Sequence, residues 1–68
     1  MEDREKLKHI LSHWMEHNDE HAGEFREWAD KAERLGEMAV RDRIVEAIEQ
    51  LKKVNEVLKG ASLELSDS

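Results

Sequence analysis

The sequence contains no cysteine and no proline, and only three glycines and three aromatic residues. Without cysteine, a disulfide framework and a thiolate metal site are excluded, so histidine and carboxylate side chains are the metal ligands that remain. The shortage of aromatic residues argues against a sheet domain. No apolar run approaches the ~20 residues that span a membrane, and the charged start MEDREK is unlike a signal peptide. We therefore expect a cytoplasmic protein with no membrane contact.

Basic residues are outnumbered, with 11 lysines and arginines against 17 acidic residues and a net charge of −6. Such a balance argues against a nucleic-acid surface, which needs clustered positive charge. A chain of 68 residues forms one domain at most and buries only a small part of its surface. Self-association or a bound metal is then the expected source of additional stability.

The first half of the chain carries a helical pattern, because the residues of one stripe recur three or four positions apart. The stripe consists of Leu7, Leu11, Trp14, Asn18, Ala22, Phe25, Ala29 and Ala32. It predicts a helix over about residues 3–35, ended by Gly36 in the left-handed conformation. We expect the aromatic residues to anchor a core or an interface. We also expect Asn18 to fix the register by pairing across a twofold axis, and we expect the same of Asn55 in the second half.

A second helical pattern follows, formed by Val40, Ile44, Ala47, Leu51, Val54 and Leu58. It predicts a helix over about residues 38–59 that ends near Gly60. Residues 62–68 have little apolar surface and are expected to form a flexible tail, which leaves a hairpin domain over residues 1–61. The predicted fold is all-α: an antiparallel two-helix hairpin.

A two-helix hairpin has one seam and two half-exposed flanks, which a second hairpin covers in a four-helix bundle. We therefore expect a homodimer, with another protein as an open alternative partner. Gly23 lies inside the first helix, where glycine costs about 1 kcal/mol relative to alanine. It either lets another helix approach closely or is a tolerated imperfection.

All four histidines lie in the first predicted helix at intervals of four: His9, His13, His17 and His21. Four residues advance a helix by about 400°, so each histidine stands one turn above the last and about 40° around from it. An i, i+4 pair offers two imidazole nitrogens to one cation. The drift carries this histidine ladder from solvent at His9 toward the apolar face at His21, which we expect to be partly buried.

Carboxylates accompany the ladder, since Glu16, Glu20 and Glu24 each follow a histidine by three residues. No lysine or arginine occurs between Lys8 and Arg26, so the local field is negative and favours a cation. The candidate ligands, in order, are His17 and His21 with Glu24 or Glu20, then His13, and last His9. Two histidines from each of two subunits, or two histidines and a glutamate, would complete a four-coordinate site.

Two hypotheses of function follow. The first is a module that binds nickel, zinc, cobalt or copper for storage, delivery or sensing, because imidazole suits all four ions. The second is a structural interaction module whose histidines only pack or respond to pH, since protonation near pH 6 would make stacked imidazoles repel one another. An enzyme is not expected, because no nucleophile has a base beside it and few glutamates face the core as a di-metal site requires.

The segment from Leu11 to Ala29, LSHWMEHNDEHAGEFREWA, resembles a family of small helical-hairpin proteins from archaea and anaerobic bacteria. The resemblance also extends to the charge pattern of the second predicted helix. It implies an independent two-helix module with histidines at positions 13, 17 and 21, and it implies no reaction.

Overall fold

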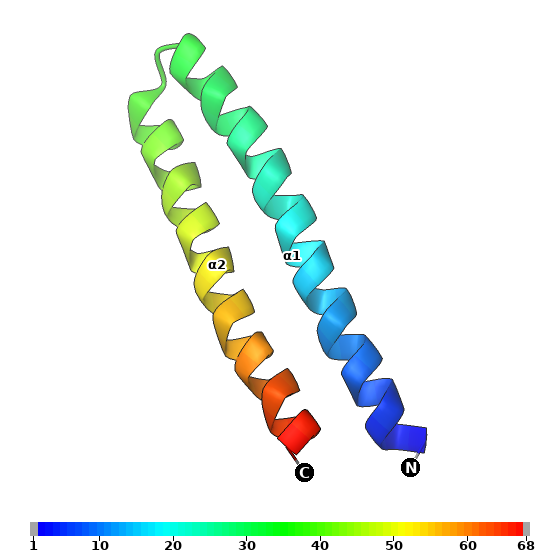
Figure 1. Cartoon of the computed structure of the whole chain (residues 1–68). Helices are drawn as coiled ribbons and strands as arrows, with labels where there is room; N and C mark the ends of the chain where they lie inside the picture. Colours follow the sequence, from blue (N-terminus) through cyan, green and yellow to red (C-terminus); the bar gives the residue numbers. More distant parts are fainter. Residues whose placement is uncertain (1, 68) are drawn as a thin grey trace.

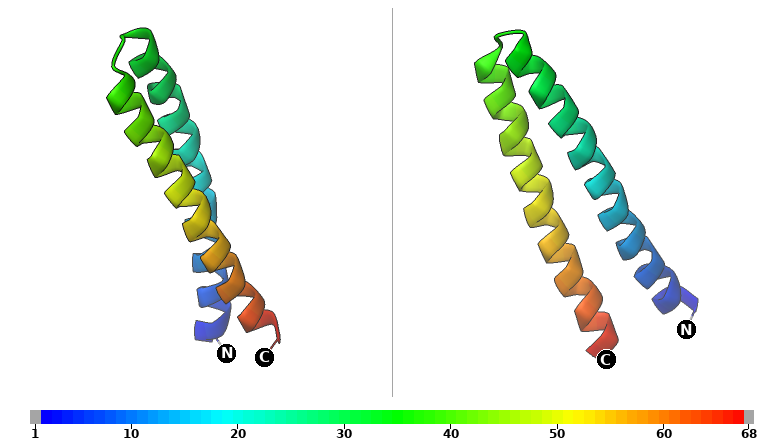
Figure 2. Two further views of the ribbon diagram at one scale, coloured as in Figure 1. Left: turned by 90° about the vertical axis from the view of Figure 1, so that its left-hand side faces the viewer. Right: turned by 45° about the horizontal axis from the view of Figure 1, so that its top comes forward.

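The chain folds into two long helices joined by a short turn. The computed structural model describes the backbone of residues 2–67 and the side chains of residues 3–66. Helix α1 spans Glu2–Arg34 and helix α2 spans Met38–Asp67. They run antiparallel and side by side, so that both termini lie at the same end (Figure 1; Figure 2). No strand occurs within residues 2–67, and the predicted all-α hairpin is confirmed.

The turn is built on Gly36, whose φ of 81° lies in the left-handed region. The Gly36 N–H donates to the Glu33 carbonyl at 3.0 Å, and the Glu37 N–H donates to the Ala32 carbonyl at 2.9 Å. This pair of hydrogen bonds is a Schellman motif, which satisfies carbonyls that the end of a helix leaves without partners. Gly36 therefore ends α1 as the sequence predicts.

The second helix is longer than its sequence pattern indicates. The predicted end near residue 59 is wrong, because α2 continues through Gly60 to Asp67. Ser62 and Leu65 are half-buried, and the Leu65 carbonyl accepts a hydrogen bond from Arg4 Nη2 at 3.4 Å. The first turns of α1 give these residues a surface to pack against. Residues 62–67 are therefore part of α2 and not a separate tail. Ser68, the last residue of the predicted tail, lies outside the described residues.

The seam between the helices is narrow. Its α1 side is formed by residues at alternating intervals of three and four: Leu11, Met15, Asn18, Ala22, Phe25, Ala29 and Ala32. The α2 side is formed mainly by Arg41, Ile44, Ile48, Leu51, Asn55, Leu58, Ser62 and Leu65. Among the described side chains only Leu11, Ala29, Ala32 and Ile48 are buried. A single seam with four buried residues is a small core for a protein domain.

Two residues of the predicted stripe on α1 lie outside the seam. Leu7 is 43% exposed and Trp14 is 50% exposed. Trp28 is 60% exposed, so neither tryptophan anchors the core of a single chain. Alanine side chains are small, so α2 packs against the face of α1 that carries Ala22, Ala29 and Ala32. The two tryptophans then remain exposed beside the seam.

An asparagine pair crosses the seam near its middle. Asn18 Nδ2 donates to Asn55 Oδ1 at 2.9 Å. Asn55 Nδ2 donates in turn to the Met15 carbonyl at 3.1 Å and to Asp19 Oδ1 at 3.0 Å. The pairing expected across a twofold axis is therefore formed between the two helices of one chain.

Candidate metal centre

Three of the four histidines stand next to one another on α1. The rings of His13 and His17 are stacked, with centroids 5.4 Å apart and an angle of 24° between their planes. The rings of His17 and His21 meet edge to face at 5.1 Å. His9 is exposed, and in the described part of the chain the ring contacts begin at His13. The structure thus forms two overlapping i, i+4 histidine pairs.

The ladder rotates around α1 relative to the seam. Counted from Leu11 in the seam, His9 and His13 face solvent, while His17 and His21 approach the side of the exposed tryptophans. The His21 ring lies 6.2 Å from the ring of Phe25, but its side chain is still 48% exposed. His21 is therefore exposed, and the partial burial predicted for it is not reached within one chain, because the ring lies beside the seam.

Glu24 holds the ring of His21. Its Oε1 atom lies 3.0 Å from His21 Nδ1. An ionised carboxylate only accepts hydrogen bonds, so Nδ1 carries the proton of this contact and Nε2 of the neutral ring keeps its lone pair. Such an outer partner orients a histidine and raises its basicity toward a metal ion. Glu24 therefore orients His21 through Nδ1, and Nε2 is left to bind a metal ion.

Glu20 has no such role in the single chain. It is exposed, and no hydrogen bond or ion pair joins it to a histidine among the described side chains. Asp19, the acidic residue before it, is occupied by Asn55 at the seam. Of the carboxylates near the ladder, Glu24 is the one that contacts an imidazole.

One chain does not complete a metal site by itself. Among the side chains of residues 3–66 no group of three or more histidine, aspartate or glutamate residues comes together closely enough to hold an ion. The pairs His13–His17 and His17–His21 each offer two ligands, whereas a zinc site needs three or four. Further ligands would have to come from outside the chain.

The exposed tryptophans belong to a continuous apolar flank of the hairpin. On α1 this apolar flank comprises Leu7, Ile10, Trp14, His17, His21, Phe25 and Trp28. On α2 it comprises Val40, Ile44, Ala47, Val54 and Leu58. Leu7, Ile10, Trp14, Trp28, Val40 and Val54 are all between 42% and 60% exposed. The sequence signal for it was the seven-residue series Leu7, Trp14, His21, Trp28 and Leu35, which runs beside the seam.

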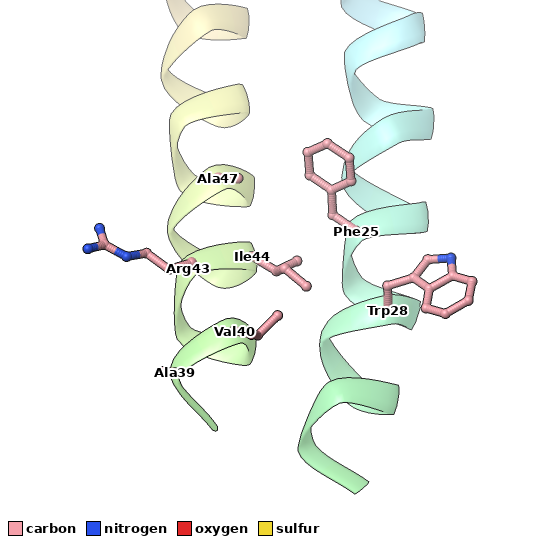
Figure 3. A pocket seen from close by; sticks show the side chains of 7 residues that line it. All are labelled: Phe25, Trp28, Ala39, Val40, Arg43, Ile44 and Ala47. Carbon is pink, nitrogen blue, oxygen red and sulfur yellow. The ribbon is translucent and has the colours of Figure 1, made fainter. Parts of the chain in front are cut away.

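Two grooves open on this flank. The larger, of about 650 Å³, lies toward the turn between Phe25 and Trp28 on α1 and Val40, Ile44 and Ala47 on α2. In Figure 3, Val40 and Ile44 point toward α1, while the ring of Trp28 is turned away from α2. The indole lies under the ammonium group of Lys31, which is 4.2 Å from the ring centroid.

The second groove lies farther along the same side and is lined by Trp14, His17, Asn18, Val54 and Leu58. His17 therefore belongs to both the ladder and the apolar flank. The opposite side of the seam differs, because the hollow there is lined by Met15, Asp19, Lys52, Asn55, Glu56 and Lys59. The hairpin has one apolar flank and one polar flank.

No helix within the described residues is long and apolar enough to pass through a lipid bilayer.

The fold and the ladder together define a small all-α hairpin with a histidine-rich first helix. The chain belongs to the family described as domain of unknown function DUF8180, whose profile matches residues 7–65. It is also similar to an uncharacterised protein of Archaeoglobus fulgidus, with 42% identity over 57 residues, which cover 84% of this chain and 90% of the relative. The resemblance to a small archaeal family is confirmed. No solved structure matches the chain.

Proposed function

We propose that this chain is a small homo-oligomeric protein of the cytoplasm that binds a divalent transition metal through the histidine ladder, for storage, delivery or sensing. The observation that carries the proposal is the edge-to-face pair of His17 and His21, 5.1 Å apart, beside the contact of His21 with Glu24. An i, i+4 histidine pair with an outer carboxylate is a recurring metal-binding arrangement on helices.

The charges around the ladder support this proposal. No lysine or arginine lies between residues 8 and 26, so no cation competes with a metal ion on this part of α1. Lys8 lies immediately before the ladder, and its Nζ atom is 3.8 Å from Glu5 Oε1 on the same helix. Glu16, Glu20 and Glu24 give the segment a negative field, which attracts a divalent ion.

Imidazole ligands narrow the choice of ion. Nickel, zinc, cobalt and copper all accept neutral imidazole nitrogen, whereas magnesium and calcium prefer oxygen. Zinc and cobalt suit a tetrahedral set of four nitrogens, which two histidine pairs would provide. The proposal includes no reaction, because the sequence offers no nucleophile with a base and an orienting group.

A second candidate function is an interaction module without metal, whose histidines respond to pH. The apolar flank favours it, because six large apolar side chains are left between 42% and 60% exposed. The two functions differ in their response to chelator. A dimer that dissociates with chelator at constant pH supports metal binding, and a dimer that responds to pH alone supports the interaction module.

Calorimetric titration of the chelator-stripped protein with each of the four ions tests the proposal. We expect micromolar or tighter binding of at least one ion, because two imidazoles per chain are already in place. Elemental analysis of the untagged protein then shows which metal it carries. Failure to bind any of the four ions at micromolar concentration would rule the function out.

The ladder offers its own matched controls. Replacing His17 by glutamine removes the residue that stands in both ring pairs, and we expect at least about tenfold weaker binding. Replacing His9 in the same way removes an exposed histidine that stands apart from these pairs. Equal losses in H9Q and H17Q would show that the ions bind nonspecifically to exposed imidazoles.

A further inference from the structure

We propose that two copies of this chain pair through the apolar flank, and that pairing brings His17 and His21 of each copy into one four-imidazole metal site. The inference rests on the proposed function for its metal, and on the exposed surface of the hairpin for its interface. Its central observation is that His17 lines a groove of the apolar flank while its ring contacts His21.

The chain exposes more surface than a compact protein of its mass, enough for a standard interface. The chain exposes 5478 Å², whereas a compact monomer of its mass, 8.0 kDa, exposes about 4,450 Å². The excess of about 1,000 Å² is similar to the ~800 Å² that each partner buries in a standard interface. The described Cα atoms extend over 52 × 15 × 10 Å, so this excess lies along the sides of a rod.

The apolar flank has the features of a surface that pairs with itself. In a twofold dimer the same patch is used by both copies, so it must hold both the protruding and the receiving parts. Trp28 protrudes at 60% exposure directly beside a groove of about 650 Å³ that is bordered by Ala39 and Ala47 (Figure 3). A second copy supplies a matching tryptophan for each groove, and the product is a four-helix bundle.

The histidines lie at the centre of this flank. His17 and His21 stand near the middle of α1, which runs from residue 2 to residue 34. One groove lies on each side of His21, with Trp14 toward one end and Phe25 toward the other. A twofold axis through the middle of the flank therefore brings the two histidine pairs face to face.

The pairing also explains why one chain lacks a complete site. Each copy provides two imidazoles, and no third ligand joins them among the described side chains, residues 3–66. Two pairs supply the four nitrogens of a tetrahedral ion such as zinc. Glu24 then serves as the outer partner of His21 in each copy. His9 and His13 point away from the flank and are not part of this shared site.

The interface is tested first by the oligomeric state. Sedimentation equilibrium should show a dimer for the natural sequence in the presence of zinc, and chelator should weaken this dimer because the shared ion no longer joins the two copies. Replacing Val54 by lysine places a charge in the groove beside His17, and we expect at least about tenfold weaker dimerisation. Val40→Lys, in the larger groove, is the second variant with the same expectation. Both positions are exposed in the single chain, so the hairpin itself should keep its helical circular dichroism.

Leu63→Lys is the matched control. Leu63 is 56% exposed and Val54 is 45% exposed. Nine residues separate them, which is half a turn of rotation around α2, so Leu63 lies opposite the apolar flank. We expect this variant to dimerise like the natural sequence. Equal weakening by L63K and V54K, or a natural chain that is monomeric both with chelator and with metal, would overturn the proposed interface.

The shared site is tested by stoichiometry. Titration with zinc or cobalt should give one ion for two chains, and cobalt should give the intense visible absorption of a tetrahedral complex. Val54→Lys should weaken metal binding together with dimerisation, while Leu63→Lys should change neither. One ion bound per monomer would overturn the shared site and leave the proposed function standing. A dimer that V54K disrupts but that binds no metal would overturn the function and the site while the interface stands.

Discussion

Asn18 and Asn55 form a hydrogen bond of 2.9 Å across the middle of the seam, and the position of every amide atom follows from their neighbours. The Met15 carbonyl and the Asp19 carboxylate can only accept, so Asn55 must turn its NH₂ group toward them. Its oxygen then faces Asn18, which must donate. This network fixes the register of α2 against α1 at one point.

We predict that part of the stability that each asparagine provides depends on the other, because they share one hydrogen bond. Asn55→Leu leaves the amide of Asn18 without its partner and should lower the free energy of unfolding by about 1 kcal/mol. The Asn18→Leu, Asn55→Leu double variant should be less destabilised than the sum of the single changes. Urea unfolding of the four proteins in a double-mutant cycle measures this coupling, with the exposed Gln50→Leu as control. Additive losses would contradict it.

The three glycines should respond differently to alanine. Gly36 has a φ of 81°, so Gly36→Ala should lower the stability by about 1 kcal/mol because an L-residue strains in this conformation. Gly23 and Gly60 lie inside helices, and an added Cβ would meet nothing within 4 Å at either position. Gly23→Ala and Gly60→Ala should each raise the free energy of unfolding by up to about 1 kcal/mol, because alanine has a higher helix propensity than glycine. Thermal unfolding followed by circular dichroism measures both signs, and stabilisation by G36A would refute the assignment of the turn.

The contact of Glu24 with His21 predicts a specific effect on metal affinity. Glu24→Ala should weaken binding about 10–100-fold, because an outer carboxylate orients its histidine and raises its basicity. Glu20→Ala removes an exposed carboxylate that does not contact the ladder in the single chain, and its effect should be much smaller. Calorimetric titration of both variants makes the comparison. A larger loss for E20A would identify Glu20 as the carboxylate that serves the ion.

Metal should also stabilise the fold, because an ion that binds only the folded state shifts unfolding by mass action. At a free ion concentration of about 100 times Kd the expected gain is ~2.7 kcal/mol per site. Differential scanning calorimetry with and without zinc measures this gain, and chelator should reverse it. The His17→Gln variant, with at least tenfold weaker binding, should gain no more than about 1.4 kcal/mol at the same ion concentration. An equal gain in this variant would mean that the ion binds elsewhere.

Local sequence is sufficient to specify the existence of two helices, the turn between them and the ladder. Intervals of three and four gather side chains on one face, Gly36 supplies the left-handed residue, and a spacing of four brings the rings of His13, His17 and His21 next to one another. All of these depend on local geometry. Neighbours along the chain are enough to fix them.

The tertiary structure decided which apolar residues meet. Periodicity marked one broad stripe on α1, but the packing of α2 against Ala22, Ala29 and Ala32 divided it into a seam and an apolar flank. Trp14, Trp28 and His21 were thereby left on the flank, and Asn18 found Asn55 within the same chain. The same packing carried α2 beyond Gly60, because the length of a paired helix depends on the surface opposite it. Contacts between distant residues decide these features, and no local pattern contains them.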